Sequence, residues 1–205
     1  MKDPAYGPLP TLLGILTLLT GFIDAVTYLK YGHVFVANMT IAGTLLAMGG
    51  FLAGALAGGL LNERLSAHRG NLLSASTAAK TALLLCATLA AAVGAEWFVV
   101  IPLLGITMGI QNAVVRRLAI PDVTTTVLTM TLTGIMADSA LVGGKNPRLG
   151  RRVAAVVTMF AGALGGASCV LYVGIPFTLG MATFIVAAVG VATYACSRGT
   201  PAWVT

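Results

Sequence analysis

Long apolar runs separated by short polar connections make up most of this chain of 205 residues. A helix needs about 20 mainly apolar residues to cross a bilayer. We count seven such runs, and the same pattern is compatible with six or eight. The runs are residues 11–30, 39–61, 71–93, 97–116, 124–143, 151–173 and 176–196. The pattern therefore predicts an all-α, polytopic membrane helical bundle that forms a single transmembrane domain over residues 1–205.

The composition agrees with this fold class. Hydrophobic residues make up 58% of the chain and charged residues only 9%, whereas soluble domains carry about 25% charged residues. The first apolar run resembles a signal peptide because Lys2 precedes it, but no small-x-small cleavage site closes it before Asp24. We interpret it as the first helix. The loops are too short for a soluble domain, so we expect any function to reside among the helices.

The net charge of +6 comes mostly from Lys and Arg residues in short loops at helix ends. Residues in such positions set membrane topology, so the charge does not indicate nucleic-acid binding. With seven crossings, five positive residues fall on one face of the membrane and six on the other. A chain balanced in this way can insert in both orientations and pair as an antiparallel homodimer. The alternative is that one early loop dominates insertion and the balance has no consequence.

Two pairs of segments indicate an internal duplication. The segment GFIDAV at 21–26 resembles GIQNAV at 109–114, and AGALAGG at 53–59 resembles AGALGG at 161–166. The first pair is separated by 88 residues and the second by 108, so the first half lacks roughly twenty residues that the second half retains.

The repeat-like halves cover about residues 11–93 and 97–196. Three crossings separate Gly21 from Gly109, which predicts that the halves are inverted relative to each other. Four crossings would make them parallel.

The motifs GFIDAVTYL, FVANMT and GIQNAVVRRLAIPDVTTTVLTMTLTG resemble those of the YoaK family of uncharacterised bacterial inner-membrane proteins. The resemblance covers most of the chain and implies a multi-pass protein of the bacterial inner membrane, without fixing an activity or a substrate. The family usually continues its first motif as Thr-Gly-Asn, whereas this chain reads Thr40-Ile41-Ala42-Gly43. This departure coincides with the missing residues and affects the first half of the proposed site.

Asp24 is an ionisable residue well inside the first run, about 9 Å from its Lys30 end at the helical rise. A central charge costs about 2.5–3.5 kcal/mol on insertion scales, and such residues usually face a cavity or a partner. We therefore expect a functional role. The alternative is a structural Asp24 that ties helices together by pairing with Lys80. For Lys80 itself we favour a side chain that extends to the membrane interface, as lysine stems often do.

Two elements that combine a helix break with threonines, 31–40 and 118–129, stand in corresponding positions of the halves. Transporters built on inverted repeats place substrate between such broken helices, with helix N-termini aimed at it. Each half would supply part of a polar site. The predicted residues are Asp24, Asn38 and Thr40 from the first half, and Asn112, Thr126 and Thr129 from the second.

Two further charged residues are candidates for binding a solute. Arg116 shares a helical face with Asn112 and could line an approach for anions, although a membrane-edge anchor is the commoner role. Asp138 lies nearer a helix end and is a weaker candidate.

The sequence does not indicate metal or cofactor binding. Cys86, Cys169 and Cys196 occupy separate apolar runs without C-x-x-C spacing. Glycines spaced four apart, such as Gly50, Gly54 and Gly58, favour helix contacts or a dimer interface.

Our functional hypothesis is a small secondary transporter or facilitator of a small solute, with an anion as one candidate class, working as a homodimer with Asp24 as a proton-coupling group. A channel-like or structural membrane protein without a transport cycle is the alternative. An intramembrane enzyme that uses Asp24 with Asp138 comes third. We predict no enzyme because no supporting catalytic motif accompanies these carboxylates.

Overall fold

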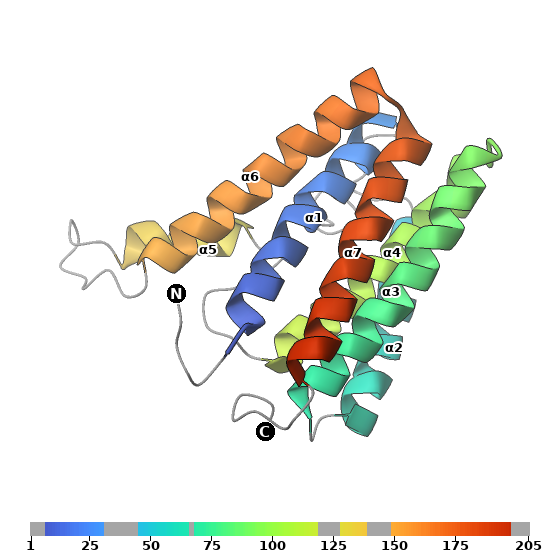
Figure 1. Cartoon of the computed structure of the whole chain (residues 1–205). Coiled ribbons are helices and arrows are strands. Elements are labelled where there is room, and N and C mark those ends of the chain that lie inside the picture. The colour runs from blue at the N-terminus through green and yellow to red at the C-terminus, as the bar shows by residue number, and fades with distance from the viewer. Residues whose placement is uncertain (1–6, 31–44, 66–67, 119–127, 139–148, 198–205) are drawn as a thin grey trace.

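The computed structural model describes residues 7–30, 45–65, 68–118, 128–138 and 149–197 (Figure 1). Within these ranges the chain forms seven helices and no strands. The helices are α1 (Leu9–Lys30), α2 (Leu45–Leu65), α3 (Arg69–Ala92), α4 (Trp97–Leu118), α5 (Leu128–Ala137), α6 (Leu149–Tyr172) and α7 (Ile175–Ser197). The predicted all-α membrane bundle is confirmed.

Six of the seven helices are long and apolar enough to cross a membrane; the exception is α5. The predicted fifth crossing, residues 124–143, overlaps α5, which has 10 residues in the described part of the chain. Since a full crossing takes about 20 residues, the described part of α5 is too short to cross a membrane by itself. The described part of the chain therefore gives six candidate crossings, the lower end of the predicted range.

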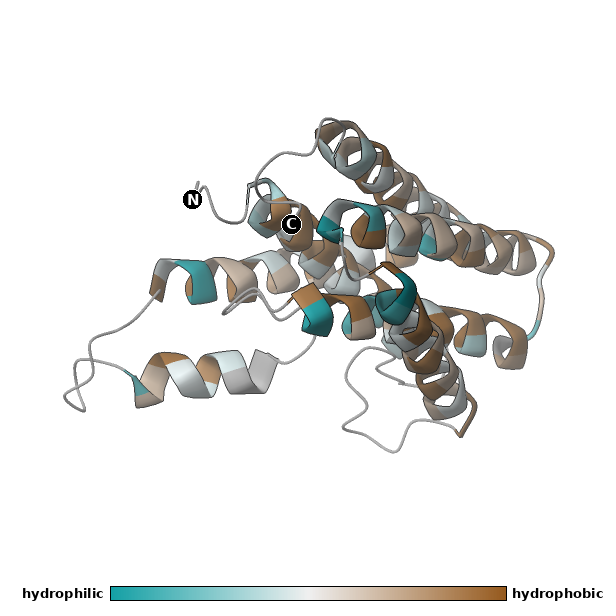
Figure 2. Cartoon of the chain, turned by 90° about the horizontal axis from the view of Figure 1, so that it is seen from below, coloured by the Kyte–Doolittle hydropathy of each residue, from teal (hydrophilic) through white to brown (hydrophobic). Residues whose placement is uncertain are grey.

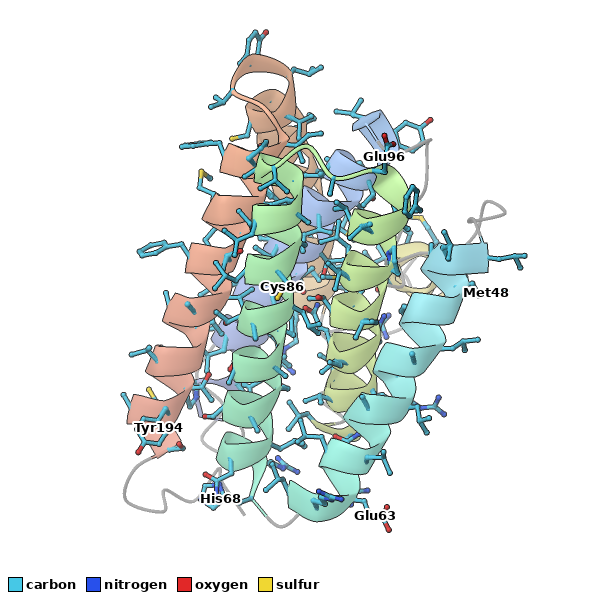
Figure 3. All side chains as sticks on the ribbon, turned by 90° about the vertical axis from the view of Figure 1, so that its right-hand side faces the viewer. Met48, Glu63, His68, Cys86, Glu96 and Tyr194 are labelled. Carbon is cyan, nitrogen blue, oxygen red and sulfur yellow. The ribbon has the colours of Figure 1, made fainter. Side chains whose placement is uncertain are left out.

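The six long helices alternate in direction along the chain (Figure 1). In Figure 3, α2 descends from Met48 toward Glu63, α3 rises from His68 through Cys86, and α7 descends to Tyr194. Hydrophilic residues lie mainly at the helix ends, whereas the middle parts of the helices are mostly apolar (Figure 2).

The outward faces carry large apolar side chains, including Leu56 (67% exposed), Leu164 (69%) and Phe184 (74%). Soluble monomeric proteins rarely expose large contiguous apolar patches. In a bilayer these side chains meet acyl chains, so the exposed apolar faces fit a membrane protein.

The strongest packing joins helices from different halves of the chain: α2 against α4, α1 against α6, and α3 against α7. Glycines allow the first two contacts. A Cβ added at Gly54 on α2 would lie 2.7 Å from the carbonyl carbon of Ile106 on α4. A Cβ added at Gly162 on α6 would lie 2.7 Å from the carbonyl carbon of Leu18 on α1. Only glycine permits backbones to approach this closely.

These two contacts are equivalent residue by residue. Gly162 follows Gly54 by 108 residues and Leu18 precedes Ile106 by 88, the two offsets found between the repeated segments. One turn further, Gly58 lies against Ile110 and Gly166 against Phe22, again with the same offsets. The glycine stripes are thus used within the chain. Dimerisation, which no contact here tests, remains a prediction from the charge balance alone.

Candidate functional site

A chain of buried polar side chains links three helices at the middle of the bundle. Lys80 Nζ on α3 donates a hydrogen bond to Gln111 Oε1 on α4. Gln111 Nε2 donates in turn to Thr20 Oγ1 on α1, at 2.8 Å. The Thr20 hydroxyl donates to the Leu16 carbonyl oxygen at 3.0 Å. All three side chains are buried, with Lys80 only 1% exposed. We call Lys80, Gln111 and Thr20 the polar chain.

Two apolar clusters enclose the polar chain along each of its helices. One contains Leu19 and Ile23 of α1, Leu84 of α3 and Met108 of α4. The other contains Leu16 of α1, Leu72 and Leu73 of α3 and Val114 of α4. The polar chain therefore forms a layer between two hydrophobic layers. In hydrocarbon, a polar group without a hydrogen-bond partner costs roughly several kcal/mol.

The prediction that Lys80 extends to the membrane interface is wrong. Its side chain is enclosed within the bundle because α4 and α7 both pack against α3. Gln111 accepts its hydrogen bond in place of water. The alternative that Asp24 pairs with Lys80 is not found either: among the described residues, no ion pair joins these two side chains.

Asp24 belongs to a buried polar stripe on α1. Thr17, Thr20, Asp24 and Thr27 recur at helical spacing and are at most 3% exposed. The three threonines donate hydrogen bonds to backbone carbonyl oxygens one turn earlier, a common way for hydroxyls to be satisfied inside helices. Asp24 lies one turn beyond Thr20, about 6 Å along the axis. The stripe thus places the Asp24 carboxyl one turn from the polar chain.

The other predicted residues are distributed unevenly. Asn112 is half-buried on α4, and Arg116 is exposed in the last turn of that helix. Asn38, Thr40 and Thr126 lie outside the described residues, and Thr129 falls in α5 without a described side chain. The convergence of the two broken elements on one site therefore stays a prediction.

Asp138 forms an ion pair that ties α5 to α6. Arg152 Nη1 on α6 donates to Asp138 Oδ2 at 2.6 Å and to the Gly134 carbonyl oxygen at 2.8 Å. Gly134 lies in the last turn of α5, and its carbonyl oxygen also accepts from the Asp138 backbone N–H at 3.1 Å. The guanidinium therefore adds a second donor to this carbonyl oxygen. The described contacts thus give Asp138 a structural role at the end of α5.

Sequence reasoning did not select Gln111 or Thr20. A signal was present for each residue: Gln111 precedes Asn112 inside an apolar run, and Thr20 lies at i−4 from Asp24 and so shares its face. Burying a polar side chain within a membrane helix costs free energy, so each such residue is a candidate for a functional or structural role. Which of them meet, however, depends on how the helices pack.

The six apolar helices and the buried polar layer define a multi-pass helical membrane protein. The chain belongs to the family described as "Protein of unknown function (DUF1275)", whose family model matches residues 12–192.

The chain is also similar to the UPF0700 transmembrane protein YoaK of Bacillus subtilis (strain 168), with 30% identity over 152 residues. That match covers 62% of this chain and 66% of the relative, just under two thirds of its length. No solved structure matches the chain.

Proposed function

We propose that the protein is a small secondary transporter or facilitator of the bacterial inner membrane, and that its solute is a small anion. The observation that carries this proposal is the polar chain of Lys80, Gln111 and Thr20, sealed between two apolar layers. Ionisable groups inside membrane bundles are costly and usually mark pathways for ions or solutes. A lysine at this depth points to function more strongly than one at a helix end.

The equivalent glycine contacts support an inverted repeat. Helices α1 and α4 occupy corresponding places in the two halves, and each packs against the glycine-bearing helix of the other half. The two helices run in opposite directions through the bundle (Figure 1), which is the relation that an inverted repeat requires. Transporters of this kind bind substrate at the junction of their repeats. Gln111 and Thr20 join α4 to α1 at that junction.

An anionic solute fits the donors at the polar chain. A lysine ammonium has three N–H donors, and among the described residues Lys80 uses one, toward Gln111. The remaining donors suit a carboxylate or an inorganic anion. Asp24, one turn from Thr20, would repel such a solute while ionised. Its protonation would remove that repulsion, which is the basis for coupling anion movement to protons.

A structural membrane protein without a transport cycle is the second candidate, and one observation favours it. The described residues form a surface cavity between α1 and α6 and another between α3 and α7, and neither is lined by Thr20, Lys80 or Gln111. Under this candidate the polar chain only holds α1, α3 and α4 together.

Uptake by proteoliposomes distinguishes the two candidates. The probes are radiolabelled acetate, lactate and nitrate, each driven by an inward proton gradient. We expect uptake of at least one probe by the unmodified protein and its loss in Lys80→Met, with Asp24→Asn removing the dependence on the gradient. Arg117→Gln serves as control because Arg117 is exposed in the last turn of α4. If the unmodified protein takes up none of the probes while the Lys80 and Asp24 variants lose folded protein, the structural candidate is preferred. Unchanged uptake in well-folded Lys80→Met would exclude the polar chain as the site.

A further inference from the structure

The surface cavity between α1 and α6, which we call the groove, is separate from the polar chain. It lies between the first halves of the two helices and has a volume of about 270 Å³. Its lining includes Gly14, Ile15 and Leu18 of α1 together with Arg151, Ala154 and Ala155 of α6. The groove is therefore mainly apolar, with one basic side chain near the start of α6.

The groove follows from where the glycines lie on the two helices. Gly162 packs against Leu18 and Gly166 against Phe22, so the two helices are in close contact from about their middles onward. Toward their beginnings the two helices separate (Figure 1). Gly14 contributes no side chain there, and a Cβ added to it would meet nothing within 4 Å. The groove is thus a wedge-shaped space between two helices that run in the same direction and separate toward their beginnings.

We propose that this groove binds one anionic phospholipid, with the headgroup at Arg151 and an acyl chain along the apolar floor. Arg151 is in the first turn of α6, at the membrane edge, where headgroups lie. The beginnings of α1 and α6 add the positive ends of two helix dipoles. Basic pockets between transmembrane helices are typical sites for anionic headgroups.

The lining also argues against a water-soluble ligand. Ile15 is 37% exposed on the outward side of α1, so the groove adjoins surface that faces the acyl chains. The neighbouring Arg152 is directed to Asp138 and Gly134 of α5. Among the described residues that line the groove, Arg151 is the basic one.

Native mass spectrometry and thermal unfolding of the full chain in detergent test the proposal. The probes are phosphatidylglycerol, phosphatidylcholine with the same acyl chains, and inorganic phosphate. We expect retention of one phosphatidylglycerol and a higher unfolding temperature with it than with phosphatidylcholine. Arg151→Gln should weaken phosphatidylglycerol binding about fivefold, the equivalent of one basic residue near a membrane surface. Gly14→Leu should displace the lipid while retaining Arg151, because it places a side chain in open space.

Arg117→Gln is the matched control: it removes an exposed positive charge at the end of the bundle where α1 begins, without touching the groove. The proposal is overturned if Arg117→Gln weakens binding as much as Arg151→Gln, since the effect would then be diffuse surface charge. Equal binding of the two lipids would also overturn it, as would unchanged binding by Gly14→Leu. A shift with inorganic phosphate as large as with phosphatidylglycerol would remove the role of the acyl chain and overturn the lipid assignment. If Arg151→Gln does not fold, Gly14→Leu decides the outcome.

Discussion

Replacing Gly54 by alanine should separate the two helices that make the most extensive contact in the bundle. The added Cβ would lie 2.7 Å from both the Cα and the carbonyl carbon of Ile106. Ordinary van der Waals contact begins at 3.4 Å, and the Ile106 carbonyl oxygen lies nearer to the added Cβ than these two carbons, so α2 and α4 would have to move apart by at least about 0.7 Å. Backbone atoms cannot rotate away as a flexible side chain could, and the strain therefore falls on the whole contact.

The cost follows from two opposing terms. Overpacking a close contact destabilises by about 1–3 kcal/mol, while alanine in place of glycine favours the helix by up to about 1 kcal/mol. Gly59, on the same helix, has nothing within 4 Å of an added Cβ, so Gly59→Ala has only the favourable term. The helix-propensity gain is common to both variants and cancels, so they should differ by the overpacking term, roughly 1–3 kcal/mol. For a chain of this size that difference corresponds to about 2–12 °C in unfolding temperature.

Thermal unfolding in one detergent, followed by intrinsic fluorescence or light scattering, measures this difference. The equivalent contact offers a second test within the same molecule: Gly162→Ala should behave like Gly54→Ala, and Gly165→Ala like Gly59→Ala. Equal unfolding temperatures for Gly54→Ala and Gly59→Ala would refute the close approach of α2 and α4. A large effect at Gly54 with none at Gly162 would show that the two contacts are not energetically equivalent.

Three further predictions concern hydrogen bonds between helices. Gln111→Leu should lower stability by about 1.5–3 kcal/mol because it leaves the Lys80 amino group without its acceptor. The double variant Lys80→Met, Gln111→Leu should unfold at a higher temperature than Gln111→Leu alone, and a lower temperature would contradict this account. Arg152→Gln should raise hydrogen exchange in α5 but not in α3, because it removes the ion pair to Asp138. If α5 exchanges at the same rate in Arg152→Gln as in the unmodified protein, other contacts keep α5 in place. Asn62→Ala should cost about 1 kcal/mol in thermal unfolding through its lost bond to the Ala113 carbonyl oxygen, and an unchanged midpoint would argue against that bond.

The candidate site was predicted only in part. Asp24 was selected because a carboxyl inside an apolar run is visible in the sequence, and the structure buries it as expected for a residue facing the bundle interior. Lys80 was placed at the interface because a lysine stem is long enough to reach it. The decisive fact was the position of α4 and α7 around α3, which hydropathy does not contain. The role of Asp138 likewise depended on Arg152, which lies on another helix.

The apolar runs alone determined that this is a multi-pass helical membrane protein, because the bilayer thickness sets a minimum length that can be counted along the chain. The repeated segments also predicted which residues correspond, and the glycine contacts follow the same offsets of 88 and 108. Only the tertiary structure decided that each half packs its glycine-bearing helix against the other half. The packing of the helices also brought Lys80, Gln111 and Thr20 into one hydrogen-bonded layer, which the sequence alone does not indicate. Helical periodicity identifies the face on which a residue lies, but the partner of that face is set by packing between segments far apart in the chain.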